Sequence, residues 1–400
     1  MTAAHRVESP FGVALVGCGG MGRRHLAAWA HLERAAATPA RLVGVCDRDP
    51  RLASAAAEQF ATATQRSPRV FASLEAALDD PEVAAVDIVI PTRFHHQSAL
   101  AALAAGRHVL VEKPFGITIR ACRVMAEAAA RSGRVLAVAE NYRRVPTHRA
   151  LKSLFDQDVI GRPYMVSVHT VQQAVPSAPG QWFRERGLVG SLPNLEFAVH
   201  EADLLLHLFG EVEEVHGLTA AFEGSGDDAG LALLRFRSGV LGHLLVLTAG
   251  HGGDTGGRLI VGARGRVDSR RWEGWEGGTV ARDGQADMRS EDWVAAWLAG
   301  LGAEERERLL PAGTWDSGQL TVDIREPLRY GIATELHDFA RAVAEGRPPE
   351  VGPDAATASV AVCLALLESA AAGHPIRVAD VLGGRVRGWQ ADLDADLGLG

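Results

Sequence analysis

The stretch Phe11-Gly-Val-Ala-Leu-Val-Gly17-Cys-Gly-Gly-Met-Gly22 joins a short apolar run to a glycine-rich turn. The apolar run is typical of a buried strand, and the alanine-rich residues 23–37 predict a helix directly after the turn. In this setting the first glycine permits the tight turn, the second lets the backbone approach a pyrophosphate, and the third lets helix and strand pack closely. The predicted cofactor-binding residues of the turn are Gly17, Gly19, Gly20, Met21 and Gly22.

A second apolar run, residues 41–46, ends in Asp47, which lies 25 residues after Gly22. That spacing is close to the roughly 20 residues expected for an acid that accepts hydrogen bonds from the adenosine ribose. The carboxylate favours NAD over NADP because it repels a 2'-phosphate, whereas the adjacent Arg48 and the nearby Arg51 would accommodate that phosphate. The alternative interpretation is that the glycines form an ordinary turn and that Asp47 caps the next helix.

Strand-like and helix-like segments alternate through the first third of the chain, which predicts a parallel sheet covered by helices. We expect a first domain over residues 1–144 and a second over 145–400. The predicted helices are 51–60, 73–78, 97–105 and 119–131, and the predicted strands are 70–71, 85–90, 108–111 and 135–139.

Glu112-Lys113-Pro114 follows the strand predicted at 108–111, and therefore lies at the edge of a parallel sheet where ligands bind. A lysine at this edge can donate to a substrate hydroxyl, stabilise a developing alkoxide or move a proton. The alternative is a surface lysine paired with Glu112.

Composition limits the class of protein. The length of 400 residues suggests two domains or one enlarged domain, and a content of 47% hydrophobic and 22% charged residues, with a net charge of -8, is ordinary for a globular protein. The absence of a long basic run argues against nucleic-acid binding, and the absence of a signal peptide or long apolar run predicts a cytoplasmic protein without a membrane partner. The four cysteines lack C-x-x-C spacing and are expected to be small core residues.

A second group of polar residues lies in a segment with helical spacing, which predicts one common face for Glu196, His200, Asp203 and His207. Histidine titrates near neutral pH, so His200 is suited to accept the hydroxyl proton while a carbinol carbon gives up hydride. For Asp203 and His207, helix capping or core hydrogen bonding is the alternative to ligand contact. We expect no metal, because neither H-E-x-x-H nor a cysteine partner is present.

The second domain contains strand-like runs at 164–168, 212–219, 229–237 and 241–248, which predict an antiparallel or mixed sheet. Residues 270–320 hold five of the eight tryptophans and have the character of an insertion, either a lid over a glycoside or aglycone, or a packing or subunit contact. Trp182 and Arg184 precede the polar helix and are predicted to form a wall of the substrate pocket.

These residues together resemble the glucose-fructose oxidoreductase, inositol dehydrogenase and MocA family (Gfo/Idh/MocA) over most of the chain. The resemblance rests on a set of motifs, each common alone but specific in combination: the glycine turn with His25, Asp47, Pro91-x-x-x-His95, Glu112-Lys113-Pro114, Asn141-Tyr-Arg143, Glu196-x-x-x-His200-x-x-Asp203, Leu336-His-Asp-Phe339, Gly346-Arg-Pro-Pro349 and Asp354.

The resemblance implies a Rossmann domain followed by an α+β domain with a large open sheet, whose exposed face commonly builds dimers or tetramers. It implies that Lys113 lies at the catalytic centre, that Pro114 forms a turn that is often cis, and that His200 is the base or a substrate ligand. Other implied cofactor contacts are Arg48, Pro91, His95 and Glu112, and other implied substrate contacts are Asn141, Arg143 and Glu196.

Two features depart from the family pattern. Glu196 stands where the family usually has aspartate, and Gly190-Ser-Leu-Pro replaces a triple glycine. The extra methylene moves the carboxylate by more than an ångström, although Glu196 is still expected to orient the proton-transfer groups.

The predicted function is an NAD-dependent, or NADP-dependent, oxidoreductase acting on a secondary hydroxyl or ketone of a sugar, glycoside or cyclitol. One alternative is a redox-neutral hydrolase or eliminase of the same fold, which oxidises a sugar carbon transiently and later reduces it. The other is a noncatalytic NAD-sensing regulator.

Overall fold

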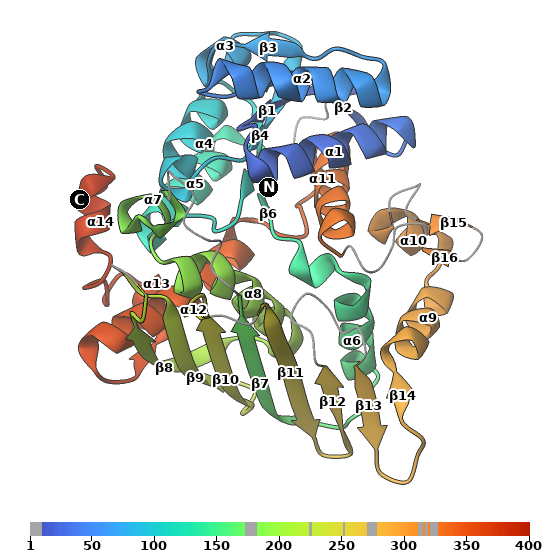
Figure 1. Cartoon of the computed structure of the whole chain (residues 1–400), viewed down its shortest axis with the longest axis vertical. Helices are drawn as coiled ribbons and strands as arrows, with labels where there is room; N and C mark the ends of the chain where they lie inside the picture. The colour runs from blue at the N-terminus through green and yellow to red at the C-terminus, as the bar shows by residue number, and fades with distance from the viewer. Residues whose placement is uncertain are drawn as a thin grey trace. The chain divides into compact units, whose positions relative to one another are not determined.

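The computed structural model describes residues 10–172, 182–223, 226–250, 253–269, 278–310, 315–316, 319–320 and 327–400. The chain divides into two compact units (Figure 1). Unit 1 comprises Met1–Gly116, Ala121–Asn141 and Gly302–Ala356, and unit 2 comprises Ile117–Arg120, Tyr142–Leu301 and Thr357–Gly400. The predicted domain boundary between residues 144 and 145 stays a prediction. The compact units are not two continuous stretches of the sequence, because residues 302–356 belong to unit 1.

Unit 1 is built on a six-stranded sheet of order β3-β2-β1-β4-β5-β6, in which every pair is parallel. The direction of winding reverses at β1, which creates the crevice where dinucleotides bind in such sheets. This confirms the predicted parallel-sheet Rossmann architecture. Its elements are β1 (Phe11–Val16), α1 (Gly20–Arg34), β2 (Ala40–Cys46), α2 (Pro50–Thr64), β3 (Arg69–Phe71), α3 (Leu74–Leu78), β4 (Val83–Ile88), η1 (Thr92–Phe94), α4 (His95–Ala104), β5 (His108–Glu112), α5 (Ile119–Ser132), β6 (Leu136–Ala139), α10 (Ala303–Leu309) and α11 (Pro327–Glu345).

Two helix starts in unit 1 differ from the prediction by more than one residue. Helix α1 begins at Gly20 rather than at residue 23, and α4 begins at His95 rather than at 97. Glycine has a low helix propensity, so the sequence pattern places the start of α1 after the glycines. In the structure Gly20 and Gly22 form the first turn of α1.

The core of unit 1 joins segments that lie far apart in the sequence. Leu15 of β1, Leu26 and Trp29 of α1, and Leu336 and Phe339 of α11 belong to one apolar cluster and are each at most 1% exposed. Burial of each such side chain contributes roughly 1.5–3 kcal/mol. Packing of α11 therefore attaches the segment 302–356 to the Rossmann sheet.

The cysteine prediction is confirmed. All four cysteines are free and buried: Cys18, Cys46, Cys122 and Cys363. Burial, with help from the nearby Asp47 carboxylate, raises the pKa of Cys18 to about 12 and that of Cys46 to about 11. Neither thiol is a thiolate at neutral pH, and both act as small core side chains.

Unit 2 is built on a nine-stranded sheet of order β14-β13-β12-β11-β7-β10-β9-β8-β17 (Figure 1). Only β7 and β10 pair in parallel among the strand pairs described, which confirms a large open mixed sheet. Its strands are β7 (Pro163–Val171), β8 (Val212–Ala220), β9 (Ala229–Phe236), β10 (Leu241–Leu247), β11 (Thr255–Gly262), β12 (Gly265–Ser269), β13 (Thr279–Arg282), β14 (Met288–Arg289) and β17 (Ile376–Arg377). Its helices are η2 (Tyr142–Arg144), α6 (Pro146–Asp156), η3 (Trp182–Arg184), α7 (Arg186–Val189), η4 (Leu192–Phe197), α8 (Ala198–Phe209), α9 (Ser290–Gly300), α12 (Pro353–Ala372), α13 (Val378–Leu382) and α14 (Ala391–Asp396).

The predicted single polar helix is divided into two types of helix. Element η4 is a π-helix, and α8 follows it as an α-helix. Glu196 lies in the π-helical part, whereas His200 and Asp203 lie in α8, so Glu196 does not belong to the same regular α-helix as His200. Asn194 of η4 packs so closely on β9 that a Cβ atom at Gly230 would lie 1.5 Å from its Oδ1, and the sequence gives no signal of this contact.

Part of the tryptophan-rich segment packs inside unit 2. Helix α9 contacts α6, and its Trp293 is 1% exposed, while Trp297 is half-buried. These two residues agree with the packing interpretation rather than with a lid. Trp272, Trp275 and the side chain of Trp315 lie outside the described residues.

Helix α12 is long and apolar enough to cross a membrane by length and composition alone. Its most apolar window is 67% buried inside the protein, and Leu364 and Ala365 are fully buried. A helix covered by its own fold is typical of a core helix, and we interpret α12 in that way.

Candidate functional site

The glycine turn of unit 1 has two glycines that the fold requires and two that it does not. Gly17 has φ +102°, and a Cβ atom there would lie 2.0 Å from the carbonyl oxygen of Val89. A Cβ atom at Gly22 would lie 2.0 Å from the carbonyl oxygen of Gly17. At Gly19 and Gly20 an added Cβ atom would meet nothing within 4 Å. The packing of the protein therefore leaves Gly19 unexplained, whereas the close approach of a pyrophosphate explains it.

The start of α1 is open to an anion. Gly19 is the N-cap residue and provides no side-chain hydrogen bond to the helix. The first N–H groups of a helix and its dipole favour a phosphate at such a position. Met21 follows in the same turn and packs against the core cluster.

Asp47 is tied to the glycine turn and does not cap the next helix. Its Oδ2 accepts from the Cys18 N–H at 2.7 Å, and its Oδ1 accepts from the Asp49 N–H at 2.8 Å. The N-cap of α2 is Asp49, which accepts from the Arg51 N–H and also pairs with the Arg51 guanidinium. The capping interpretation of Asp47 is therefore wrong, and Arg48 is the exposed cation beside it.

Lys113 begins a turn at the carboxyl end of the sheet, as predicted. Strand β5 ends at Glu112 and lies between β4 and β6, and the Lys113–Pro114 peptide bond is cis. His95 contacts this turn through its Nδ1, 3.0 Å from the Pro114 carbonyl oxygen, and contacts the Ile90 carbonyl oxygen through Nε2 at 2.8 Å. Burial lowers the pKa of His95. His95 thus supports the turn that carries the half-buried Lys113.

Pro91 and Asn141, both predicted ligand contacts, also lie in unit 1. Pro91 is the N-cap of η1, and its carbonyl oxygen accepts from the Phe94 N–H at 2.9 Å. Asn141 is buried and packs so closely on α11 that a Cβ atom at Gly331 would lie 2.8 Å from its Cβ.

In unit 2, His200 is positioned by an aromatic stack. Its ring lies 4.1 Å from that of Tyr142, with 10° between the planes, and the residue is 8% exposed. Tyr142 also contacts the ring of His148, whose pKa is held well below its usual value by burial and by Arg258. The stack fixes the plane of the His200 imidazole. Sequence analysis missed Tyr142, although it lies inside the Asn141-Tyr-Arg143 motif.

Two buried ion pairs hold α8. Arg143 donates from Nε to Asp203 Oδ2 at 2.7 Å and from Nη2 to Oδ1 at 2.5 Å, and the Ser359 hydroxyl donates to the same carboxylate. Glu201 pairs with Arg258, and both side chains are at most 3% exposed. Core hydrogen bonding is therefore the observed role of Asp203, and Arg143 has a structural role beside any contact with substrate. His207 lies in the last turn of α8 and is half-buried.

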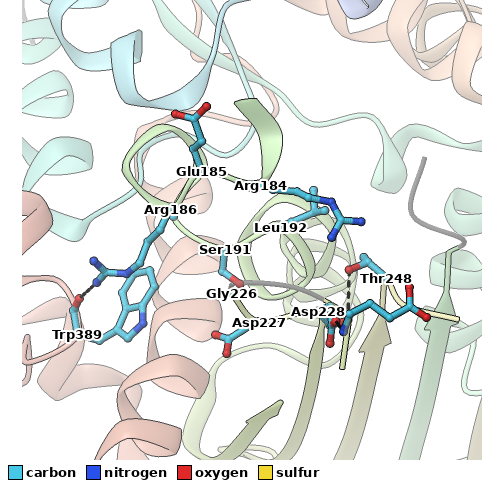
Figure 2. A pocket seen from close by; sticks show the side chains of 12 residues that line it. Arg184, Glu185, Arg186, Ser191, Leu192, Gly226, Asp227, Asp228, Thr248 and Trp389 are labelled. Atoms are coloured by element: carbon cyan, nitrogen blue, oxygen red, sulfur yellow. Dashed lines mark hydrogen bonds between the residues drawn. The ribbon is translucent and has the colours of Figure 1, made fainter. Parts of the chain in front are cut away.

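A polar cavity of about 670 Å³ lies in unit 2, beside the start of η4 (Figure 2). Arg184, which the sequence predicts to contact substrate, lines this cavity, and its buried Nε meets no hydrogen-bond acceptor among the described residues. Trp182 is 45% exposed and does not line it. The full lining is Arg184, Glu185, Arg186, Gly190, Ser191, Leu192, Glu223, Gly226, Asp227, Asp228, Thr248 and Trp389.

The charged groups of this cavity are partly committed to the protein. Arg186 lies over the Trp389 ring at 4.4 Å and pairs with Asp392. Asp228 accepts from the Phe222 N–H at 2.8 Å. Burial, with the adjacent Asp228 adding to the effect and the Thr219 hydroxyl opposing it, raises the pKa of Asp227 above its usual range. The cavity therefore offers acceptors, donors and an indole to a polar ligand.

Comparisons with known proteins agree with the fold of each unit. The family model described as an oxidoreductase family with an NAD-binding Rossmann fold matches residues 11–140, and the Gfo/Idh/MocA C-terminal domain matches 148–268. Levoglucosan dehydrogenase of Pseudarthrobacter phenanthrenivorans is 28% identical over 84% of this chain and 89% of its own. Inositol 2-dehydrogenase 2 of Saccharopolyspora erythraea is 31% identical over 80% of this chain and 93% of its own.

Solved structures give the same result. A levoglucosan dehydrogenase in complex with NADH and levoglucosan has a TM-score of 0.78 and 25% identity, and covers 92% of this chain and 99% of its own. GenD2 from gentamicin A biosynthesis, in complex with NAD, has a TM-score of 0.71 and 27% identity, and covers 94% of this chain and 98% of its own.

We predict that a methyl group at Gly19 weakens cofactor binding, whereas a methyl group at Gly22 lowers the stability of the fold. Gly19→Ala should change the free energy of unfolding by less than about 1 kcal/mol and should weaken NADH binding at least tenfold, because the methyl group fills space that the pyrophosphate needs. Gly22→Ala should destabilise the protein by about 1–3 kcal/mol through overpacking. Thermal unfolding and NADH fluorescence titration measure both effects. Wild-type NADH affinity in Gly19→Ala would contradict the assignment.

Proposed function

This chain belongs to the Gfo/Idh/MocA family of oxidoreductases, and on that premise we propose that it transfers hydride between NAD and a secondary hydroxyl, or the matching ketone, of a sugar, glycoside or cyclitol. The observation that carries the proposal is the position of Lys113, on a turn supported by His95 at the carboxyl end of the NAD-binding sheet. Relatives named as levoglucosan and inositol dehydrogenases support the substrate class.

The proposed roles follow from the chemistry of the side chains. NAD, when bound, accepts the hydride in the oxidative direction. Lys113 donates to the substrate oxygen and stabilises the charge that develops there, and His200 accepts the hydroxyl proton. The Tyr142 ring stacks on the His200 ring and sets its plane, while Glu196, half-buried in η4, orients these groups.

We further propose that the polar cavity of unit 2 binds hydroxyl groups of the substrate. Sugars and cyclitols present many hydroxyl groups, each of which can donate and accept a hydrogen bond. The cavity matches this with the carboxylate of Asp227, the hydroxyls of Ser191 and Thr248, and the buried Nε of Arg184. Its volume lies within the range that small-molecule sites occupy, about 300–1,000 Å³.

The open face of the nine-stranded sheet supports a homo-dimer or homo-tetramer. Met165 of β7, Leu218 of β8, Leu233 of β9 and Leu241 of β10 are 39–60% exposed. The strand register places them on one face. Large exposed apolar side chains gathered on one face of a sheet are typical of a protein interface, and a second copy of the chain is the partner we propose.

The substrate class is tested by reduced-nicotinamide absorbance with a panel of sugars, inositols and glycosides in the presence of NAD or NADP. A substrate-dependent rise with NAD is expected, and Lys113→Ala and His200→Ala should each lower kcat by roughly a hundredfold or more. Lys152→Ala, which removes a lysine paired with Asp156, is the control and should retain activity.

Two outcomes of that experiment would contradict the dehydrogenase proposal. Turnover of a glycoside with no net absorbance change would indicate redox-neutral chemistry on bound NAD. Absence of turnover, together with undiminished biological activity of Lys113→Ala, would indicate an NAD sensor.

The cavity proposal predicts a change in KM. Arg184→Gln and Asp227→Asn should each raise the substrate KM about tenfold and leave kcat within about twofold, because these side chains are proposed to bind the substrate and not to transfer hydride or protons. Arg162→Gln, an exposed arginine that lies over Tyr164, is the matched control. An unchanged KM in both cavity variants would show that the cavity does not bind the substrate.

The interface proposal predicts that Leu233→Glu lowers the mass measured by sedimentation equilibrium to that of a monomer. A buried charge at the centre of an apolar interface is strongly unfavourable. Val70→Glu is the control, because Val70 is also an exposed apolar residue, at 46%, but lies on strand β3 of unit 1. A monomeric wild type, or an unchanged mass in Leu233→Glu, would exclude this interface.

A further inference from the structure

A buried histidine links the helix that follows the glycine turn to the strand that precedes Lys113. His25 of α1 is fully buried. Its Nδ1 lies 3.0 Å and 3.2 Å from the two carboxylate oxygens of Asp87 in β4, and its Nε2 lies 3.0 Å from Oε1 of Glu112, the last residue of β5. One imidazole thus joins three neighbouring elements of unit 1.

The rest of the cluster fixes the histidine in turn. Trp29, one helical turn after His25, donates from its indole Nε1 to Asp87 Oδ2 at 2.9 Å. Glu335 of α11 lies with one carboxylate oxygen 3.8 Å from His25 Nε2. The imidazole therefore faces three carboxylates, one of which is itself held by an indole, and contacts on both nitrogens set the plane of the ring.

We infer that His25 is a positioning residue, which holds Glu112 and thereby the backbone from which Lys113 extends, in register with the helix that starts at the glycine turn. The inference rests on the proposed function, since it assigns a purpose to the position of Lys113. Adjacent residues share a peptide unit, so fixing Glu112 restricts the Cα of Lys113 to a sphere of 3.8 Å radius.

The protonation state supports this role. Burial alone would lower the pKa of His25, but Asp87 and then Glu112 outweigh it and raise that pKa well above its usual value. An imidazolium has an N–H on both nitrogens and can donate to Asp87 and Glu112 together, whereas neutral imidazole has one donor. A charged donor to a carboxylate makes the stronger hydrogen bond.

The same atoms meet the distance criterion for a metal site, since ligand atoms of His25, Glu112 and Glu335 lie within 4.8 Å of one another. A metal would need a deprotonated Nε2, and the surrounding carboxylates favour the proton on this nitrogen. If zinc ions stabilise the wild type but not His25→Gln, then this site binds a metal ion in place of the proton on Nε2. That result would overturn the inference.

A pair of isosteric substitutions tests the link. The amide nitrogen of asparagine superimposes on the histidine Nδ1, and that of glutamine on Nε2. His25→Asn therefore keeps the donor to Asp87 and loses the donor to Glu112, while His25→Gln does the reverse. We expect His25→Asn to lower kcat roughly ten- to a hundredfold with KM for NAD within about threefold, and His25→Gln to retain kcat within about threefold. Equal kcat losses, or the opposite order, would overturn the inference.

A control and a second measurement separate this inference from the proposed function. His108→Gln changes another buried histidine, at the opposite end of β5, whose Nδ1 accepts from the Val135 N–H. It should lower the melting temperature without lowering kcat. If no substrate is found for the wild type, the proposed function fails, but hydrogen exchange of the amides of residues 109–116 in the NADH-bound protein still tests the link. Faster exchange in His25→Asn than in His25→Gln is expected, and equal exchange would refute the link.

The pH dependence of the difference in stability between the wild type and His25→Gln is an independent test of the protonation state. Because the folded pKa of His25 lies above the unfolded one, the contribution of the imidazolium is fully present below the unfolded pKa and is lost as pH rises through the folded pKa. The difference in free energy of unfolding should therefore shrink as pH rises. A difference that grows with pH would show that neutral His25 is the stabilising form.

Discussion

The close approach of α1 to β1 is the constraint on which the rest of unit 1 depends. The carbonyl oxygen of Gly17 lies where a side chain at Gly22 would begin, and the backbone at Val89 lies where a side chain at Gly17 would begin. The helix therefore lies tight against the strand ends. Its buried face then brings His25 and Trp29 to Asp87 of β4, so the glycine spacing determines the place of the buried imidazole as well as the place open to a pyrophosphate.

Sequence alone predicted much of this arrangement because the signals are local. Alternating apolar runs predicted the parallel sheet, and the position of Lys113 followed from the strand before it. The start of α1, the π-helical turn at Glu196 and the return of residues 302–356 to unit 1 were not predictable in the same way, because packing decides them. Ion-pair partners are non-local too: Arg143 and Asp203 are 60 residues apart, and periodicity reports that a residue is buried without naming its partner.

The polar face predicted over η4 and α8 shows why a row of polar residues at helical spacing is weak evidence for a ligand site. Asp203 is occupied by Arg143 and Ser359, and Glu201, which has no place in the predicted row, pairs with Arg258 inside the protein. Apolar residues of similar volume often replace a buried ion pair at little cost in stability. The two ion pairs instead fix the position of α8. A helix held by two bidentate contacts can neither rotate nor slide without separating a buried ion pair.

A buried, paired carboxylate also lies next to each residue proposed to interact with the reacting hydroxyl. Lys113 follows Glu112, whose carboxylate is bound by His25, and His200 precedes Glu201, whose carboxylate is bound by Arg258. In both places a buried, paired carboxylate is the immediate neighbour in the chain, and its fixed position is passed on through one peptide unit. Hydride transfer depends on geometry, since misplacement by about 1 Å can cost roughly a hundredfold in rate. Placing the paired charge beside the reactive residue fixes the backbone of each unit at that point.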